Sequence, residues 1–429
     1  MAGKAFFADV LSFNSHDSKD HRAHLLRDAL MLVEGGRITA LGSAAELESQ
    51  LPEGVEKIRY IGKTIAPGFI DVHLHFPQLD VIASRADGLL PWLENHTFPQ
   101  EARFANAHHS DNIAKLFLDE MLRHGVTTGM AFCTSHPESV DALMAESQAR
   151  KMRMVAGKCL MDRHCPEGVR DATERSLLDS EQLIQRWHGR DRLGYALTPR
   201  FAPSCSDEQM RGAAQLAQTY PGVWVQTHVA ENREEIAWVK TLYPQARSYL
   251  DVYERFGLLR PRSMYAHCIY LDETDRQRLQ ACGAAAAVCP TSNLFLGSGL
   301  FDFEQADTAG FDYGFASDVG GGTSFSPFRT MLGAFEIARL RGKTLSPSEL
   351  WYRHTLGAAR AMDLSTKVGN LAVGMEADFI VLDNHATPLL ARRSSLANSL
   401  DEWLFSLIVL GDDRVVSQVY VAGQISKLD

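Results

Sequence analysis

PGFIDVHLHF, residues 67–76, is a short apolar run that ends in His73-x-His75. Side chains two residues apart on a β-strand point to the same face of the sheet, so both imidazoles can reach one ion. Neutral imidazole is the commonest side-chain ligand of metals in proteins. Two unrelated histidines would give the same local pattern, so the prediction of a metal site depends on further ligands elsewhere in the chain.

The run belongs to a series that predicts the fold. Eight short apolar runs alternate with longer amphipathic segments, which is the signature of βα units and a parallel sheet. The runs are 69–75, 125–132, 152–161, 193–198, 222–229, 263–269, 284–289 and 311–318. Eight such units predict an α/β protein with a (β/α)8 TIM barrel.

Apolar residues at helical spacing mark three of the helices between or after these runs. Residues 206–219 open with Ser206 and carry Gln209 three places on, which predicts a capping box. The apolar positions that define the three helices are Ile113, Leu116, Phe117 and Met121, then Met210, Ala213, Ala214 and Ala217, and finally Phe328, Met331, Leu332, Phe335 and Ala338.

Both ends of the chain differ from its middle. A barrel takes roughly 250 residues, and this chain has 429. Residues 1–64 and 370–429 contain short strand-like runs with turn signals, such as MLVEGGRITALG and VVSQVYVAG. We therefore expect the two ends to form one small β-sandwich domain beside a barrel at 65–369.

The connection after the first apolar run is long. Residues 76–110 separate this run from its helix, whereas such loops usually take about 2–6 residues. The segment holds Trp92, His96 and Phe98. Long loops in compact domains are often functional, so we expect this one to close over a ligand.

Composition argues against several classes of function. The formal net charge is −10 and no basic run occurs, so neither nucleic acid nor an anionic membrane is an expected partner. The first ten residues, MAGKAFFADV, lack a signal-peptide core, and no apolar run approaches the roughly 20 residues of a membrane span. The seven cysteines are scattered without a Cys-x-x-Cys pair, which favours reduced thiols and a cytoplasmic protein.

Three more residues complete the candidate metal site. His228 ends the fifth run, His267 lies near the end of the sixth, and Asp318 closes the eighth. The C-terminal ends of barrel strands converge on one face, so these side chains and the His73-x-His75 pair should meet there. Each residue alone could have a purely structural role. Together they predict a site for a single metal ion.

A second metal ion would need a bridging ligand. Lys158 in the third run could supply one as a modified lysine. Lysine also buries its stem readily in a core, and this reading of Lys158 is the simpler one.

Several stretches carry a family resemblance. PGFIDVHLHF, HVAEN, YAHC and SDVGGG resemble the amidohydrolase superfamily. Longer stretches are similar to the guanine deaminase family within it: HLHFPQ (73–78), PWLENHTFPQE (91–101), TPRFAPSCS (198–206), QTHVAEN (226–232), CPTSNLFLGSG (289–299) and ASDVGGGTSFS (316–326). The resemblance spans essentially the whole chain.

The resemblance implies hydrolysis of guanine to xanthine and ammonia, as in purine catabolism, by a homodimer. It implies one Zn²⁺ per subunit, held by His73, His75, His228 and Asp318. Nitrogen and carboxylate ligands suit iron as well as zinc, so the sequence does not separate the two metals. It also implies that the purine is held and processed by Gln78, Arg200, Phe201 and Glu231.

The expected catalytic residues are Asp318, His267 and Glu231. A metal ion lowers the pKa of water to about 7, and Asp318 would be ligand and first base for that water. His267 would orient the water for attack at C2 of the purine. Glu231, three residues after His228, would carry protons to a ring nitrogen and to the leaving amine. The alternative for Glu231 is a surface residue that caps the next helix.

Four residues are expected to contact the purine besides Glu231. Gln78 offers both a donor and an acceptor, and the planar cation of Arg200 can fork onto the guanine carbonyl. Phe201 and Trp92 could stack on the base. Each has an ordinary alternative, which is a loop position for Gln78, a salt bridge for Arg200, and the core for Phe201 and Trp92.

The sequence bears on three alternative functions. The cytidine-deaminase type of zinc site needs P-C-x-x-C, and this chain has only the reversed order Cys289-Pro290. Related barrels deaminate other purines, pyrimidines or triazines, and a substrate panel would separate these. A scaffold protein that has lost its metal ligands is the alternative outside enzymes, but here all expected ligands are present.

Overall fold

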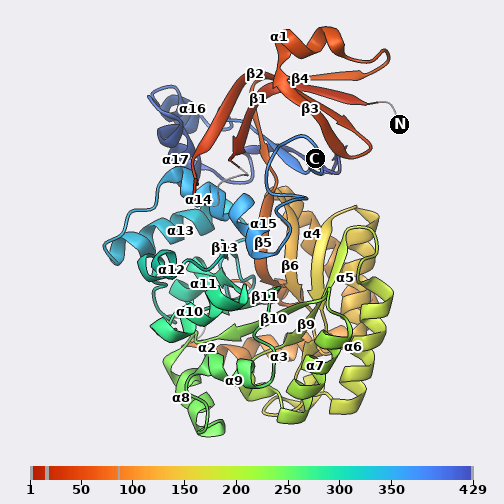
Figure 1. Cartoon of the computed structure of the whole chain (residues 1–429), viewed down its shortest axis with the longest axis vertical. Coiled ribbons are helices and arrows are strands. Elements are labelled where there is room, and N and C mark those ends of the chain that lie inside the picture. Colours follow the sequence, from red (N-terminus) through yellow and green to blue (C-terminus); the bar gives the residue numbers. More distant parts are fainter. Residues whose placement is uncertain (1–2, 15–18, 86, 427–429) are drawn as a thin grey trace.

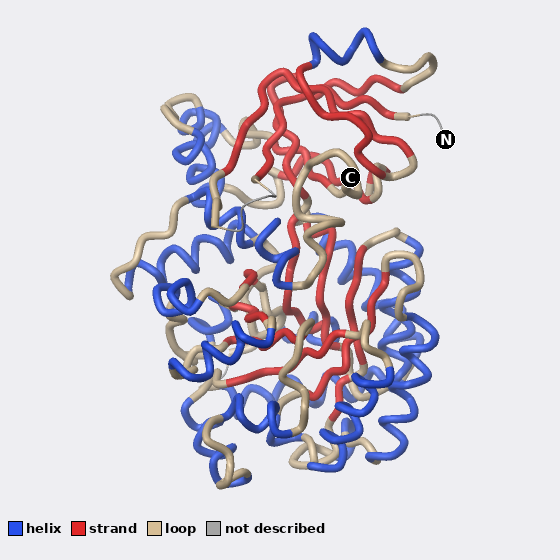
Figure 2. The backbone as a smooth tube through the Cα atoms, viewed as in Figure 1, coloured by secondary structure: helices blue, strands red, loops and turns tan. Residues whose placement is uncertain are grey.

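A computed structural model describes residues 3–14, 19–85 and 87–426 of the chain. It has two parts, a barrel of parallel strands surrounded by helices and a separate sheet at one end of that barrel (Figure 1). The tube view shows the barrel strands enclosed by helices on their outer side (Figure 2).

The barrel consists of eight principal strands, each hydrogen-bonded in parallel to the next in sequence. They are β5 (Phe69–His75), β6 (Val126–Phe132), β7 (Arg153–Gly157), β9 (Leu193–Pro199), β10 (Trp224–Val229), β11 (Ser263–His267), β12 (Ala285–Val288) and β13 (Tyr313–Phe315), with a short β8 (Cys159–Leu160) beside β9. Each of the eight predicted runs coincides with one of these strands to within a few residues at either end. The predicted (β/α)8 fold is confirmed.

Closure of the barrel brings the last strand against the first. The Asp318 amide, just after β13, donates to the carbonyl of His73 at 3.0 Å. The His75 amide donates to the carbonyl of Val319 at 2.6 Å. These contacts fix the C-terminal end of β5 beside the residues that follow β13.

Helices cover the outside of the barrel. They are α4 (Ala107–Arg123), α5 (Pro137–Ala149), α6 (Thr173–Trp187), α7 (Asp207–Thr219), α8 (Arg233–Leu242), α9 (Tyr249–Arg255), α10 (Glu273–Cys282), α11 (Pro290–Phe295), α12 (Phe303–Ala309), α13 (Pro327–Leu340), α14 (Pro347–Arg353) and α15 (Leu356–Ala361). Among the described residues, no helix has both the length and the apolar composition that crossing a membrane would need.

The three predicted helices are present, with two corrections of detail. The Ser206 side chain accepts from the Gln209 amide at the start of α7, but the Gln209 side chain donates to Ser176 instead of returning to Ser206. The predicted capping box is therefore only half formed. Leu116 of α4 is 49% exposed, so it lies outside the buried face of that helix.

The long connection after β5 is built from short helical turns. They are η2 (Phe76–Val81), α2 (Leu89–Trp92), the π-turn η3 (Leu93–Thr97), α3 (Phe98–Glu101) and η4 (Ala102–Ala105). α4 begins at Ala107. Figure 1 shows α2 and α3 at the end of the barrel away from the second sheet.

Both chain ends build the second sheet, as predicted. Its order is β16-β15-β14-β4-β1-β2-β3, from β1 (Lys4–Phe13), β2 (Ala23–Glu34), β3 (Arg37–Ser43), β4 (Glu56–Pro67), β14 (Phe379–Leu382), β15 (Val416–Val421) and β16 (Gln424–Ile425). Because β4 pairs with both β1 and β14, the strands form one continuous sheet and not the two packed sheets of a sandwich. The domain limits at 64/65 and 369/370 stay predictions.

The C-terminal segment also contains helices that the sequence patterns did not indicate. α16 (Pro388–Ser394) and α17 (Leu400–Leu410) pack together, and α17 also packs against α13 and α14. Leu404, Leu407 and Ile408 are buried at helical spacing along α17. The N-terminal segment adds the short α1 (Ala44–Leu47) followed by η1 (Glu48–Gln50).

A buried ion network joins the second sheet to the barrel. Glu376 accepts hydrogen bonds from Arg153 of β7 at 2.6 and 2.8 Å and from Arg192 at 2.9 Å. Arg192 also pairs with Asp378. The carboxylate of Glu376 thus lies between two guanidinium groups with little access to water.

We expect Glu376→Gln to lower the free energy of unfolding by about 3 kcal/mol, because it leaves two buried cations without their shared anion. Denaturant titration followed by circular dichroism measures the change. The control is Glu48→Gln, the same substitution at an exposed glutamate that pairs with Lys57 and Arg59, which should change stability far less. Equal stability losses in the two variants would contradict this account of the junction.

Candidate metal centre and substrate pocket

The ends of four barrel strands place the predicted site residues together. His73 and His75 end β5, His228 lies near the end of β10, His267 ends β11, and Asp318 follows β13. Each side chain is buried or nearly so at the C-terminal mouth of the barrel. The predicted convergence of these five residues is confirmed.

Four of these residues form a compact set of donors. One ligand atom from each of His73, His75, His228 and Asp318 lies within 4.8 Å of the others. Asp318 Oδ1 is 3.2 Å from His73 Nε2 and 3.3 Å from His75 Nε2. The Nε2 atoms of His75 and His228 are 3.2 Å apart. This spacing lets all four atoms reach one central ion.

The charge states also fit a cation. Burial lowers the pKa of His75 to about 4, and together with neighbouring imidazoles it lowers that of His228 well below its usual range. Burial alone would raise the pKa of Asp318, but its close contacts with His73 and His75 hold it well below the ordinary value. His75 and His228 are therefore neutral imidazoles beside an ionised Asp318, the protonation states in which these groups bind metals.

Two ring nitrogens, Nε2 of His73 and Nε2 of His228, indicate that a cation completes the donor set. Nε2 of His73 is buried without a hydrogen bond of good geometry. His228 Nδ1 lies 2.6 Å from the carbonyl of Arg200, so it carries the proton and leaves Nε2 unprotonated. Buried acceptors of this kind are costly unless a partner satisfies them, and a divalent metal ion would do so.

Beside the donors, His267 and Glu231 face each other. His267 Nε2 lies 3.4 Å from Glu231 and 3.8 Å from Asp318, while its Nδ1 lies 2.9 Å from Asn293 Oδ1. Ser298 donates to the other oxygen of Glu231 at 2.8 Å. Burial and the charge of Asp318 raise the pKa of Glu231 to about 8. Glu231 is thus an interior carboxyl and not the surface residue of the alternative reading.

A small cavity adjoins these groups. Its free volume is about 30 Å³, and it is bordered by His75, Gln78, Leu89, Trp92, Leu93, Arg200, Phe201, His228, Glu231, Glu235, His267, Leu296, Asp318 and Gly321. Every residue predicted to contact the purine therefore borders one space. Trp92 donates its indole N–H to the carbonyl of Ser84 at 3.2 Å, so its ring presents an apolar face.

The remaining sequence candidates lie outside this cavity. Lys158 pairs with Asp171 at 2.6 Å, which supports the core reading over a metal-bridging one. His96 contacts the carbonyl of Arg85. Phe98 is buried, and the guanidinium carbon of Arg200 lies 5.0 Å from the centre of its ring.

Sequence reasoning missed three buried polar residues around the cavity. Asn293 and Ser298 contact His267 and Glu231, respectively. Glu101 contacts both Gln78 and Arg200. Their partners are distant in sequence. The only signal available was their place inside the quoted stretches 91–101 and 289–299.

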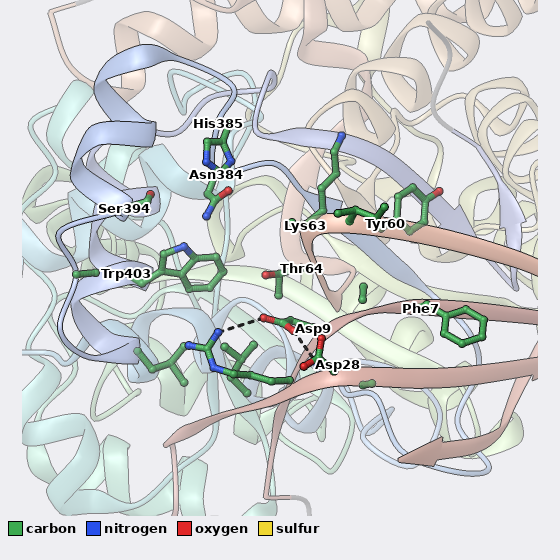
Figure 3. Close-up of a pocket in the computed structure, with 18 of the residues that line it drawn as sticks. Phe7, Asp9, Asp28, Tyr60, Lys63, Thr64, Asn384, His385, Ser394 and Trp403 are labelled. Atoms are coloured by element: carbon green, nitrogen blue, oxygen red, sulfur yellow. Dashed lines mark hydrogen bonds and ion pairs between the residues drawn. The ribbon is translucent and has the colours of Figure 1, made fainter. Parts of the chain in front are cut away.

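A wider hollow of about 880 Å³ lies between the second sheet and α16–α17 (Figure 3). Its charged side chains include the pair Arg27–Asp9 and Lys63, whose partner Asp383 lies outside the lining. Among the described residues, both clusters able to hold a metal lie in the barrel mouth, and they share His73 and Asp318. The chemistry of the molecule is therefore concentrated in the smaller cavity.

The chain matches known proteins along nearly its whole length. The model of the amidohydrolase family matches residues 64–426. The guanine deaminase of Escherichia coli K12 is 42% identical over 99% of this chain and 97% of its own. A solved E. coli guanine deaminase superposes with a TM-score of 0.96 at 40% identity, covering 99% of both chains. A guanine deaminase from C. acetobutylicum, solved with guanine in its active site, gives 0.89 at 29% identity and the same coverage.

We expect His73→Ala to lose most of its bound divalent metal, because one of four converging donors is removed. Elemental analysis of the purified variant by mass spectrometry measures this loss. His354→Ala is the matched control, since that imidazole is equally buried but contacts the carbonyl of Ile70 outside the donor set. Wild-type metal content in His73→Ala would show that the ion, if any, binds elsewhere.

Proposed function

The chain belongs to the amidohydrolase family, with guanine deaminases as its full-length relatives, and from this premise we propose that it hydrolyses guanine to xanthine and ammonia. The observation that carries the proposal is identity of 42% with a guanine deaminase over nearly the whole chain, combined with the donor set in the barrel mouth. In this reaction water adds to C2 of the purine and the C2 amine leaves as ammonia.

We propose that the resident metal is zinc, one ion per subunit, held by His73, His75, His228 and Asp318. A divalent ion in such a site lowers the pKa of water to about 7 and so supplies a nucleophile at neutral pH. The nitrogen and carboxylate donors support zinc, although iron accepts the same ligands.

Asp318 and His267 prepare the attacking water. The carboxylate of Asp318 is the first acceptor for its proton, because its second oxygen faces His267 at 3.8 Å. His267 donates from Nδ1 to Asn293, so its Nε2 is an acceptor directed at the same space. The water is therefore oriented by two acceptors, one from β11 and one from the segment after β13, which is the positioning that lowers the entropic part of the barrier.

Glu231 is the proposed proton carrier. Its Oε1 accepts from Ser298, so its Oε2 is left to face His267 and the cavity. Its backbone amide donates to Glu235, which fixes the loop after β10. The two protons come from the attacking water. From this position the carboxyl can take them up one after the other, and deliver the first to a purine ring nitrogen and the second to the leaving amine.

Recognition of the base falls to four residues that border the cavity. We propose that Arg200 and Gln78 hydrogen-bond the polar edge of guanine, while Phe201 and Trp92 contact its faces. The free volume of about 30 Å³ holds about two waters and no purine. Entry of the base therefore requires outward movement of side chains above the site, among which Leu89, Trp92 and Leu93 come from the long connection after β5.

The cellular location, oligomeric state and metabolic role of the enzyme are also proposals. All seven cysteines are free thiols, which supports the predicted cytoplasmic location. The predicted homodimer rests on the family resemblance alone and stays a prediction, as does a role in purine catabolism.

The first test mixes purified protein with guanine and follows xanthine and ammonia together. We expect the two products in equal amounts, loss of activity with a chelator, and recovery on adding Zn²⁺. A panel of other aminopurines, pyrimidines and triazines read by ammonia release should show guanine as the preferred substrate. Preference for another amine, or full activity after metal removal, would refute this assignment.

We expect Glu231→Gln to keep its metal but to lower kcat about 10²- to 10⁴-fold, because the amide cannot carry the two protons. Metal analysis beside the ammonia assay separates these effects. Glu234→Gln changes an exposed glutamate at the start of α8 and should leave both readings unchanged. A fully active Glu231→Gln enzyme would remove Glu231 from the reaction.

A further inference from the structure

A buried carboxylate lies behind the substrate cavity and holds two of the side chains that border it. Glu101, at the end of α3, is 1% exposed. Its Oε2 accepts from Arg200 Nη1 at 2.6 Å, and its Oε1 accepts from Gln78 Nε2 at 2.9 Å. Glu101 itself does not border the cavity, whereas both of its partners do.

We propose that Glu101 is a positioning residue that determines recognition of the C6 carbonyl of guanine, by fixing the guanidinium of Arg200 and the amide of Gln78. The inference rests on the proposed function, because it concerns the substrate of that same site. The reaction chemistry itself gives Glu101 no role, since the residues that orient the water and carry the protons lie at or after the ends of β10, β11 and β13.

Arg200 is held on several sides. Its backbone amide donates to the carbonyl of Leu160 at 3.2 Å, and its carbonyl accepts from His228. The ring of Phe98 lies 5.0 Å from its guanidinium carbon, and Glu101 binds one of its terminal nitrogens. A guanidinium has five N–H donors in one plane, so one hydrogen bond to Glu101 fixes the direction of the others.

Electrostatics explain why the anion is needed. Arg200 is only 3% exposed, and the Glu101 carboxylate, 2.6 Å from its Nη1, balances its charge there. Without that anion, a buried guanidinium would move toward water or draw in solvent. The cationic fork therefore stays in the cavity wall because Glu101 lies behind it.

The amide of Gln78 is oriented by the same carboxylate. An ionised carboxylate only accepts hydrogen bonds, so the Gln78 NH₂ group must face Glu101. The amide oxygen then faces the Gly320 backbone N–H at 3.3 Å. Rotation of the amide by 180° would place oxygen against oxygen and is excluded. Glu101 thereby sets which polar atoms Gln78 offers to a ligand.

This arrangement favours a purine with an oxygen at C6. A fixed cation opposite that oxygen gives a charge-assisted hydrogen bond, which a purine without the oxygen cannot make. A site built to bind a polar group discriminates strongly against analogues that lack it. The contribution of Glu101 should therefore depend on the C6 oxygen and not on the rest of the base.

The test compares two competitive inhibitors of guanine deamination, hypoxanthine with the C6 oxygen and unsubstituted purine without it. In Glu101→Gln we expect the inhibition constant of hypoxanthine to rise about 10- to 100-fold, the range for one charge-assisted hydrogen bond. The constant for purine should change less than about twofold on the same scale. Metal content should remain at the wild-type level.

Three further proteins separate positioning from general loss of structure. Glu101→Asp keeps the charge on a shorter side chain, so its inhibition constant for hypoxanthine should lie between those of the wild type and Glu101→Gln. This variant can still be measured if Glu101→Gln folds poorly. Glu376→Gln removes an equally arginine-bound buried glutamate far from the cavity and should leave the ratio of the two inhibition constants unchanged. In an Arg200→Ala background, adding Glu101→Gln should weaken hypoxanthine little further.

If Glu101→Gln and Glu101→Asp raised the inhibition constants of hypoxanthine and purine equally, the inference would be overturned, because Glu101 would then have a structural role alone. A large further loss in the Arg200→Ala background would overturn the route through Arg200. Wild-type protein that releases no ammonia from guanine would refute the proposed function first, and the inference with it. Active wild-type enzyme with unchanged inhibition in Glu101→Gln would refute the inference alone.

Discussion

Four donor atoms crowded into the interior of a barrel are the constraint on which the rest of this structure depends. The nitrogens of His73, His75 and His228 and an oxygen of Asp318 lie within 4.8 Å of one another, nearly all out of contact with water. Burying acceptors without partners is costly, and their lone pairs repel one another. Rigid strands that hold the four atoms in place, and the cation proposed to bind them, would offset this cost. A parallel barrel suits this need because its strands cannot shift singly.

The backbone shows how that rigidity is achieved. Asp71, two residues before His73, accepts from the amides of both His73 and Ser317, so one buried carboxylate ties β5 to the segment carrying Asp318. The carbonyl of Arg200 accepts from the amide and the imidazole of His228, which ties β9 to β10. Hydrogen bonds such as these, made by groups next to the donors, orient the donor side chains and set the tautomers of their imidazoles. They also mean that Arg200, proposed to bind the base, shares its backbone with the support of a metal ligand.

Much of this was accessible from sequence because the rules involved are local. Alternating βα patterns predicted all eight barrel strands, and strand ends predicted where His73, His228 and Asp318 would meet. α17 was not predicted, because an apolar run such as LDEWLFSLIVL suits a buried strand and a buried helix equally. The contacts of Glu101 were not predicted for another reason. Its partner Arg200 is 99 positions away, and no spacing rule connects an acid in one loop with a cation after a distant strand.

The site thus draws on two sources with different physical demands. The proposed metal donors lie on or directly after barrel strands, where small displacements would separate them. The groups around Arg200 come largely from the segment after β5, with Phe98 against its guanidinium and Glu101 behind it. That segment is made of short helical turns, and it also supplies the side chains that must move to admit a base. Glu101 and the apolar side chains Leu89, Trp92 and Leu93 therefore belong to one segment of the chain. A change in this segment can therefore alter the choice of substrate while the donor set stays intact.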